Sequence, residues 1–240
     1  MANHGNIFTS FTPLWDAIWG YLSDKRIEDF TTYANTTEGD AIYPTGDTAR
    51  LRVNPTTDVL DFSCASNSIN TNIYRDIGIA NISDTSWILR FKLDITTLVK
   101  EVGVNQMRLY ISLNSLHALG DPQTEDGLGM LISYRSGNDL IHGYIDNGGT
   151  SAQTSTGIVP SATTYYVEFV RLDADNFRIR LFSDSTYTTQ LSTNTITISS
   201  AYTGLRYFGV QHYTETGTTN NIVGTIDNIL FANNRTTPPS

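Results

Sequence analysis

Oxygen-bearing side chains that could bind a hard cation gather in the stretch NSLHALGDPQTEDGLG, residues 114–129. Asp121, Glu125 and Asp126 supply carboxylates there, and Asn114 adds an amide oxygen. Calcium takes about six to eight oxygen ligands of these kinds, but the spacing does not match the EF-hand loop. The stretch is therefore either a calcium site built on Asp121, Glu125 and Asp126 or a solvated acidic loop, and no other cofactor is indicated.

Tyrosines beside amides and charged groups form a second set of candidate residues, which would bind a glycan. The alternating stretch MRLYISLN, residues 107–114, places Tyr110 among polar neighbours, and Gln211 begins the stretch QHY. Aromatic rings cover the apolar side of a sugar, while amides and charged groups bind its hydroxyls. The alternative is that tyrosine is common on the solvated faces of sheets. The candidate glycan ligands are Arg108, Tyr110, Asn114, His212 and Tyr213.

The sequence contains no recognisable catalytic constellation. Glycosidases use two carboxyl groups roughly 5–10 Å apart, whereas Glu168 is the one acid in its predicted strand, with Asp173 and Asp175 in the turn that follows. The four histidines lack metal-ligand spacing, and there is no Gly-x-Ser-x-Gly elbow. We therefore predict that the protein is not an enzyme.

Apolar and polar residues alternate with a period of two along most of the chain, which predicts antiparallel strands. In TSWILRFKLDITTL, Arg90 and Lys92 lie on the polar face. The opposite face should be buried and consists of Trp87, Leu89, Phe91, Leu93 and Ile95. About a dozen short strands joined by turns indicate a sandwich or a barrel. Residues 147–164, rich in Gly, Ser and Thr, predict a surface loop. Further strands are predicted within 105–115 and 175–185 and near 49–54, 59–65, 72–79, 128–136, 139–146, 164–172, 188–198, 204–213 and 222–231.

Four stretches resemble the concanavalin A-like lectin/glucanase superfamily: DTSWILRFKLDIT, TTYYVEFVRLDADNFRIRLFSDSTY, LRYFGVQHY and GTIDNILF. The nearest likeness is to the laminin-G-like jelly rolls of environmental and viral sequences. It extends over about residues 28–232 and consists of a pattern of strands rather than of catalytic motifs. The resemblance implies an all-β, two-sheet antiparallel jelly-roll sandwich whose concave face often binds glycans. The Glu-x-Asp-x-x-Glu motif of the superfamily's retaining glucanases is absent here.

A short amphipathic helix is predicted in SFTPLWDAIWGYLSDK, residues 10–25, ahead of the strands. Thr12 can cap this helix, and Pro13 suits its first position. An isolated helix of about ten residues would not hold its shape in water. We therefore expect residues 1–27 to be an arm that docks on another copy or on a partner protein, followed by a sandwich at 28–232 and a polar tail at 233–240. Packing of the helix on its own sandwich is the alternative. The apolar stripe of the arm consists of Leu14, Trp15, Ile18, Trp19 and Leu22.

The formal net charge is −9, from 15 basic and 24 acidic residues. Nucleic acids and anionic membrane surfaces both attract positively charged proteins, so neither is an expected partner. No apolar stretch is long enough to span a bilayer, and no signal peptide is recognisable.

Two functions remain open. We favour a non-catalytic structural or surface subunit of a particle (virion surface, decoration or fibre type), which can also contact glycans. Such a subunit would be a homo-oligomer or bind a partner structural protein, on a virion or in an extracellular assembly. The alternative is a soluble carbohydrate-binding, lectin-like module.

Overall fold

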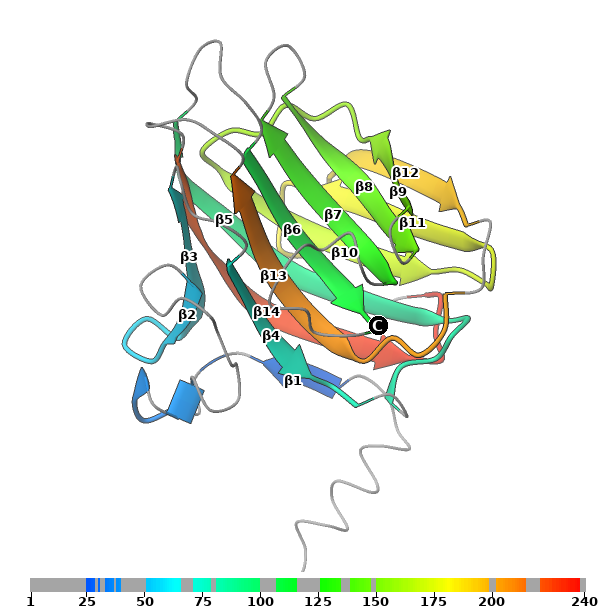
Figure 1. Ribbon diagram of the computed structural model, residues 1–240, viewed down its shortest axis with the longest axis horizontal. Helices are drawn as coiled ribbons and strands as arrows, with labels where there is room; N and C mark the ends of the chain where they lie inside the picture. The colour runs from blue at the N-terminus through cyan, green and yellow to red at the C-terminus, as the bar shows by residue number, and fades with distance from the viewer. Residues whose placement is uncertain are drawn as a thin grey trace, which may run out of the picture.

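The computed structural model describes residues 25–28, 30, 33–36, 38–39, 51–65, 71–78, 81–99, 107–115, 126–134, 139–147, 150–198, 202–214 and 221–237. In this part of the chain two antiparallel sheets face each other, and the smaller one lies in front of the larger one in Figure 1. The strands are β1 (Lys25–Glu28), β2 (Leu51–Asn54), β3 (Val59–Ala65), β4 (Thr71–Asp76), β5 (Trp87–Val99), β6 (Met107–Asn114), β7 (Gly127–Tyr134), β8 (Leu140–Asn147), β9 (Thr150–Ser155), β10 (Thr164–Arg171), β11 (Asn176–Phe182), β12 (Gln190–Thr197), β13 (Tyr207–Thr214) and β14 (Asn221–Asn233).

The larger sheet, sheet A, has the strand order β12-β11-β10-β5-β14-β3-β2, and β1 also pairs with β14. The smaller sheet, sheet B, has the order β4-β13-β6-β7-β8-β9. Strands β6 to β9 follow one another as in hairpins, whereas β5 lies between β10 and β14, which come much later in the chain. The predicted all-β, two-sheet antiparallel jelly-roll sandwich is therefore confirmed.

The core lies between the two sheets and follows from the alternation within each strand. In β5, the side chains from Trp87 to Ile95 on the predicted apolar face are buried, while Arg90 and Lys92 lie on the opposite face and are half-buried. The rings of Phe91 in sheet A and Phe208 in sheet B are 6.3 Å apart, so they connect the two layers. Each large side chain of this kind contributes roughly 1.5–3 kcal/mol when it is fully buried.

Sheet B is also divided into an inner and an outer set of side chains. In β6, Leu109, Ile111 and Leu113 belong to the main core, whereas Tyr110 belongs to a separate cluster on the other side of the sheet. Strand alternation places Arg108, Tyr110, Ser112 and Asn114 together on this outer face. The outer face of sheet B is therefore the surface on which the predicted glycan ligands of β6 lie.

Two strands, β1 and β9, were not expected from the sequence. Residues 147–164 were predicted to form a surface loop, which was wrong because β9 forms the edge of sheet B beside β8. The described side chains of this strand, residues 152–155, are all exposed, so no apolar alternation marks it in the sequence.

The predicted N-terminal helix lies outside the described residues. Among the residues that are described, no helix is long and apolar enough to cross a membrane.

Candidate functional site

The outer face of sheet B carries a row of glycines between polar side chains. On β7, Gly127 and Gly129 point to this face, opposite Asn114 and Ser112 of β6. On their other side, Gly127 is opposite Asp146 of β8, and Gly129 is opposite Tyr144. Neighbouring strands are about 4.8 Å apart, so the two glycines form a strip without side chains between β6 and β8. We call this strip, with the polar residues beside it on β6 and β8, the hollow.

The glycines are needed because other groups occupy the space that a side chain would fill. A Cβ on Gly129 would lie 2.2 Å from the carbonyl oxygen of Ile111, and one on Gly127 would lie 2.6 Å from Oδ1 of Asn114. A Cβ on Gly209 of β13 would lie 3.1 Å from Nδ2 of Asn114. The Asn114 amide therefore extends over two neighbouring strands, and this position depends on glycine on both of them.

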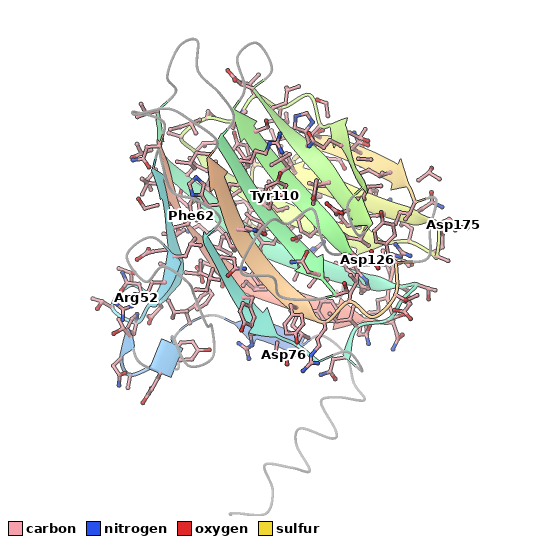
Figure 2. The ribbon with its side chains drawn as sticks, viewed as in Figure 1. Arg52, Phe62, Asp76, Tyr110, Asp126 and Asp175 are labelled. Carbon is pink, nitrogen blue, oxygen red and sulfur yellow. The ribbon has the colours of Figure 1, made fainter. Side chains whose placement is uncertain are left out.

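The centre of the outer face is closed to solvent. Tyr110 and Tyr144 are each 1 % exposed, and their rings pack edge to face with centroids 4.9 Å apart. The Tyr144 hydroxyl donates to Oδ2 of the fully buried Asp146 at 2.5 Å, and Arg108 Nη1 donates to the Tyr110 hydroxyl at 3.2 Å. We had expected Tyr110, which Figure 2 labels on β6, to be an open stacking platform for a sugar. Its burial means that it is not one. It supports the hollow from within this buried network.

The margin of the hollow, where β6 ends and β7 begins, is less buried than its centre. Asn114, Ser115 and Asp126 are half-buried there, and the Ser115 amide donates to the Asp126 carbonyl at 2.9 Å. Oδ1 of Asn114 accepts from the Ser112 hydroxyl at 2.9 Å, but neither its Nδ2 group nor the Asp126 carboxylate has a partner among the described residues. Asp126 is labelled in Figure 2. Within the described part of the chain, an amide donor and a carboxylate acceptor therefore remain for a ligand.

Acidic groups also concentrate at this end of the sandwich. Burial, followed by the negative charges of Asp126 and Asp146, raises the pKa of Tyr202 to about 12. Both carboxylates therefore lie close enough to influence the same phenol. Tyr202 remains protonated across the physiological range, so its hydroxyl keeps its hydrogen.

The other predicted site residues are not all brought together. His212 is fully buried opposite Leu109, on the inner face of sheet B, so it cannot bind a glycan beside Tyr110. The physical reason is strand alternation, which sends successive side chains to opposite faces. Tyr213 is opposite Arg108 in the register, and its side chain is outside the described part of the structure. Asp121 and Glu125 lie outside the described residues as well.

Several residues of the hollow were missed in the sequence. Asp146, Tyr144 and the two glycines of β7 come close to Asn114 only through the pairing of β6, β7 and β8. His142, on the same face, is also buried; its Nδ1 has no partner in the described structure, and burial lowers its pKa. The alternation of β8, LIHGYIDN, could have placed His142, Tyr144 and Asp146 on one face.

Glu168, the acid considered for catalysis, lies far from this hollow on the outer face of sheet A. Its carboxylate is fully buried and accepts from Nε of Arg90 at 2.9 Å and from Nε of Arg180 at 2.6 Å. The second nitrogens of both guanidinium groups also contact it. A carboxylate enclosed by two cations is poorly placed to transfer protons, and this arrangement is consistent with an ion cluster that stabilises the fold.

Comparison with solved structures gives many similar folds at low sequence identity. The carbohydrate recognition domain of Emp47p matches with a TM-score of 0.59 and 11% identity, over 86% of this chain and 93% of that one. The exoplasmic/lumenal domain of VIP36, solved with Ca²⁺ and Man2, matches with a TM-score of 0.57 and 10% identity, over 88% and 89% of the two chains. The CBM2 module of an evolved Dit protein from Lactobacillus casei BL23 phage J-1 matches with a TM-score of 0.50 and 10% identity, over 88% and 96%.

No family model matches the sequence. No curated protein matches it either. At these identities the similarities establish the fold alone, and the chain has the concanavalin A-like jelly-roll fold that the sequence resemblance predicted.

Proposed function

We propose that this chain is a non-catalytic, carbohydrate-binding module of the lectin type, with its ligand site at the half-buried margin of the hollow. The observation that carries the proposal is a pair of polar groups, the Asn114 amide donor and the Asp126 carboxylate, that have no partner among the described residues. A sugar hydroxyl both donates and accepts hydrogen bonds. One hydroxyl can accept from the Asn114 amide while its neighbour donates to the Asp126 carboxylate. Gly127 and Gly209 leave the space that the Asn114 amide occupies, so they hold this donor in position at the margin.

The comparisons support the same reading. Two of the similar structures are lumenal or carbohydrate recognition domains, and one of them was solved with Man2. The sequence-based prediction favoured a particle subunit and kept the lectin-like module as the alternative. The polar hollow on sheet B and the fold of the similar structures now favour that alternative.

The described residues do not by themselves make a calcium site. Asn114, Asp126 and Asp146 would supply one amide and two carboxylates, fewer than the about six to eight oxygens that calcium takes. No group of three or more His, Cys, Asp or Glu side chains in the described residues is arranged to hold a metal. The predicted ligands Asp121 and Glu125 are outside those residues, so calcium binding remains a prediction.

A glycan array followed by calorimetry tests the proposal, with calcium present in the buffer. We expect binding to at least one glycan and no release of its sugars. Asn114→Ala should weaken the best ligand by about tenfold, because one hydrogen bond to a ligand is lost. Gln190→Ala is the matched control, since this exposed amide lies on β12 of the other sheet. Array signals that stay at background, or equal affinities for the two variants, would overturn the proposal.

A second proposal keeps the assembly function. The phage Dit module is a specific reason to retain it, because its fold is similar to that of this chain. In this case the module would act on a virion or in an extracellular assembly, as a homo-oligomer or bound to a structural partner. Light scattering on the full chain and on a deletion of residues 1–24, which leaves β1 in place, tests the idea. Loss of a discrete oligomer in a truncated chain that still folds would support it, and a monomeric full chain would count against it.

A further inference from the structure

A groove of about 500 Å³ lies on the outer face of sheet A, the sheet that does not carry the proposed glycan site. Arg90 and Lys92 of β5 line it together with Asn228 and Leu230 of β14, and residues 185–187 form its other side. Its volume falls within the range of roughly 300–1,000 Å³ that is typical of ligand pockets. The groove is therefore large enough to hold a small molecule.

The side formed by residues 185–187 is held in place by hydrogen bonds and by an aromatic contact. The Asp184 carboxylate accepts from the backbone amides of Thr186 at 3.0 Å, Thr188 at 3.2 Å and Thr189 at 2.5 Å. The Tyr187 ring then lies 4.1 Å from the guanidinium carbon of Arg90. Tyr187 has a φ of 56°, a left-handed conformation that is uncommon for residues other than glycine. These contacts fix the position of the Tyr187 ring at the groove.

The charges around the groove leave one cation without a partner. The fully buried Glu168 is shared by Arg90 and Arg180, so this cluster carries two positive charges against one negative charge. Lys92 has no hydrogen bond or ion pair among the described residues. Asp227, which is opposite Lys92 in the register, accepts instead from the backbone and side-chain amides of Asn228, both at 2.6 Å.

We propose that this groove is a second ligand site, which binds a saccharide that carries a carboxylate group. The carboxylate binds the Lys92 ammonium and is also attracted by the guanidinium of Arg90. Arg90 and Lys92 are two residues apart on one strand, so both lie on the same face and at the same groove. Arg90, Arg180 and Lys92 carry three positive charges against the one negative charge of Glu168, so a bound carboxylate would reduce this excess.

The remaining lining favours a sugar over a simple anion. Tyr166 and Ser185 bring hydroxyl groups to the groove, and neither has a hydrogen-bond partner in the described residues. Burial raises the pKa of the Tyr187 hydroxyl, so it stays a neutral donor. The chain as a whole has a net charge of −9, which repels extended polyanions. A small ligand with one carboxylate and several hydroxyls therefore fits the groove best.

The test compares D-glucuronate with D-glucose, which differ in the carboxylate, by NMR titration of the full chain. We expect glucuronate to bind about tenfold more tightly than glucose, because a charge-assisted bond is added. Lys92→Gln should abolish this difference, and Lys92→Arg should retain it. Asn114→Ala should leave glucuronate binding unchanged, which separates this site from the proposed glycan site on sheet B.

Four binding results would overturn the proposal. The first two are equal binding of the two sugars and acetate binding as tightly as glucuronate. The third is glucuronate binding that survives Lys92→Gln in a folded protein. The fourth is loss of glucuronate binding in Asn114→Ala. A dimer in light scattering that Lys92→Gln dissociates would also overturn it, because the groove would then take an acidic side chain of a second copy. The failure of Asn114→Ala to weaken a neutral glycan would affect only the function proposed for sheet B.

Discussion

Replacing Glu168 with glutamine should destabilise the fold far more than a comparable change at an exposed ion pair. The Glu168 carboxylate is fully buried, and its two oxygens each face a different arginine, Oε2 facing Arg90 and Oε1 facing Arg180. Glutamine preserves the shape but puts an N–H₂ group against one of these guanidinium donors. One arginine therefore loses its acceptor and meets a second donor, while the negative charge between the two cations disappears.

The expected magnitude follows from the burial of this cluster. Removing one member of a buried ion pair costs about 3–5 kcal/mol, because the remaining charge stays desolvated. A domain of this size loses about 2–4 °C of Tm for each kcal/mol, so Tm should fall by about 6–20 °C. Thermal unfolding followed by circular dichroism, with urea unfolding for the free energy, measures both quantities.

The control is Asp76→Asn, which breaks the pair between Asp76 and Arg206. That pair has similarly short contacts, with Arg206 Nη2 at 2.6 Å from the carboxylate, but both side chains are more than 40% exposed. Exposed pairs contribute little because water screens them, so this variant should unfold close to the temperature of the wild type. Equal losses of Tm in the two variants would refute the reasoning, because burial would then not decide the strength of the Glu168 cluster.

Three further predictions concern the core, the hollow and the acid stability. Trp87→Ala should cost about 3–5 kcal/mol in urea unfolding, because a fully buried indole leaves a large cavity; a loss below about 1 kcal/mol would contradict the described core. Gly129→Ala should lower Tm and reduce glycan binding, because its Cβ would lie 2.2 Å from the Ile111 carbonyl oxygen; an unchanged Tm would show that β7 can shift. Hydrogen bonds, first of all from the Thr186 side chain, lower the pKa of Asp184 well below its usual value of 3.8. The stability that Asp184 contributes is therefore fully present above about pH 4 and is lost as the pH falls towards its folded pKa. Asp184→Asn should remove that part of the acid dependence, as measured by urea unfolding across this pH range, and an identical pH dependence in both proteins would contradict it.

The local pattern of the chain determined most of the fold. The alternation from Trp87 to Ile95 specifies which side of β5 is buried, because a strand sends successive side chains to opposite faces. The same rule predicted that Arg90 and Lys92 would lie on the other face, and the structure agrees. Alternation failed where it is weak, as in β9, whose residues 152–155 are exposed and polar. It also shows, in retrospect, that His212 and Tyr213 could not share a face.

The tertiary structure alone decided which residues meet at the proposed sites. Asn114 faces Gly127 and Asp146 because β6, β7 and β8 pair in one register, and a shift of one residue would send every side chain to the other face. Glu168 is enclosed by Arg90 and Arg180 because β10 pairs with β5 on one side and with β11 on the other. Arg90 and Glu168, which the pairing of β5 and β10 brings together, are 78 positions apart in the sequence. They depend on how two whole sheets pack, so no local stretch of the sequence contains them.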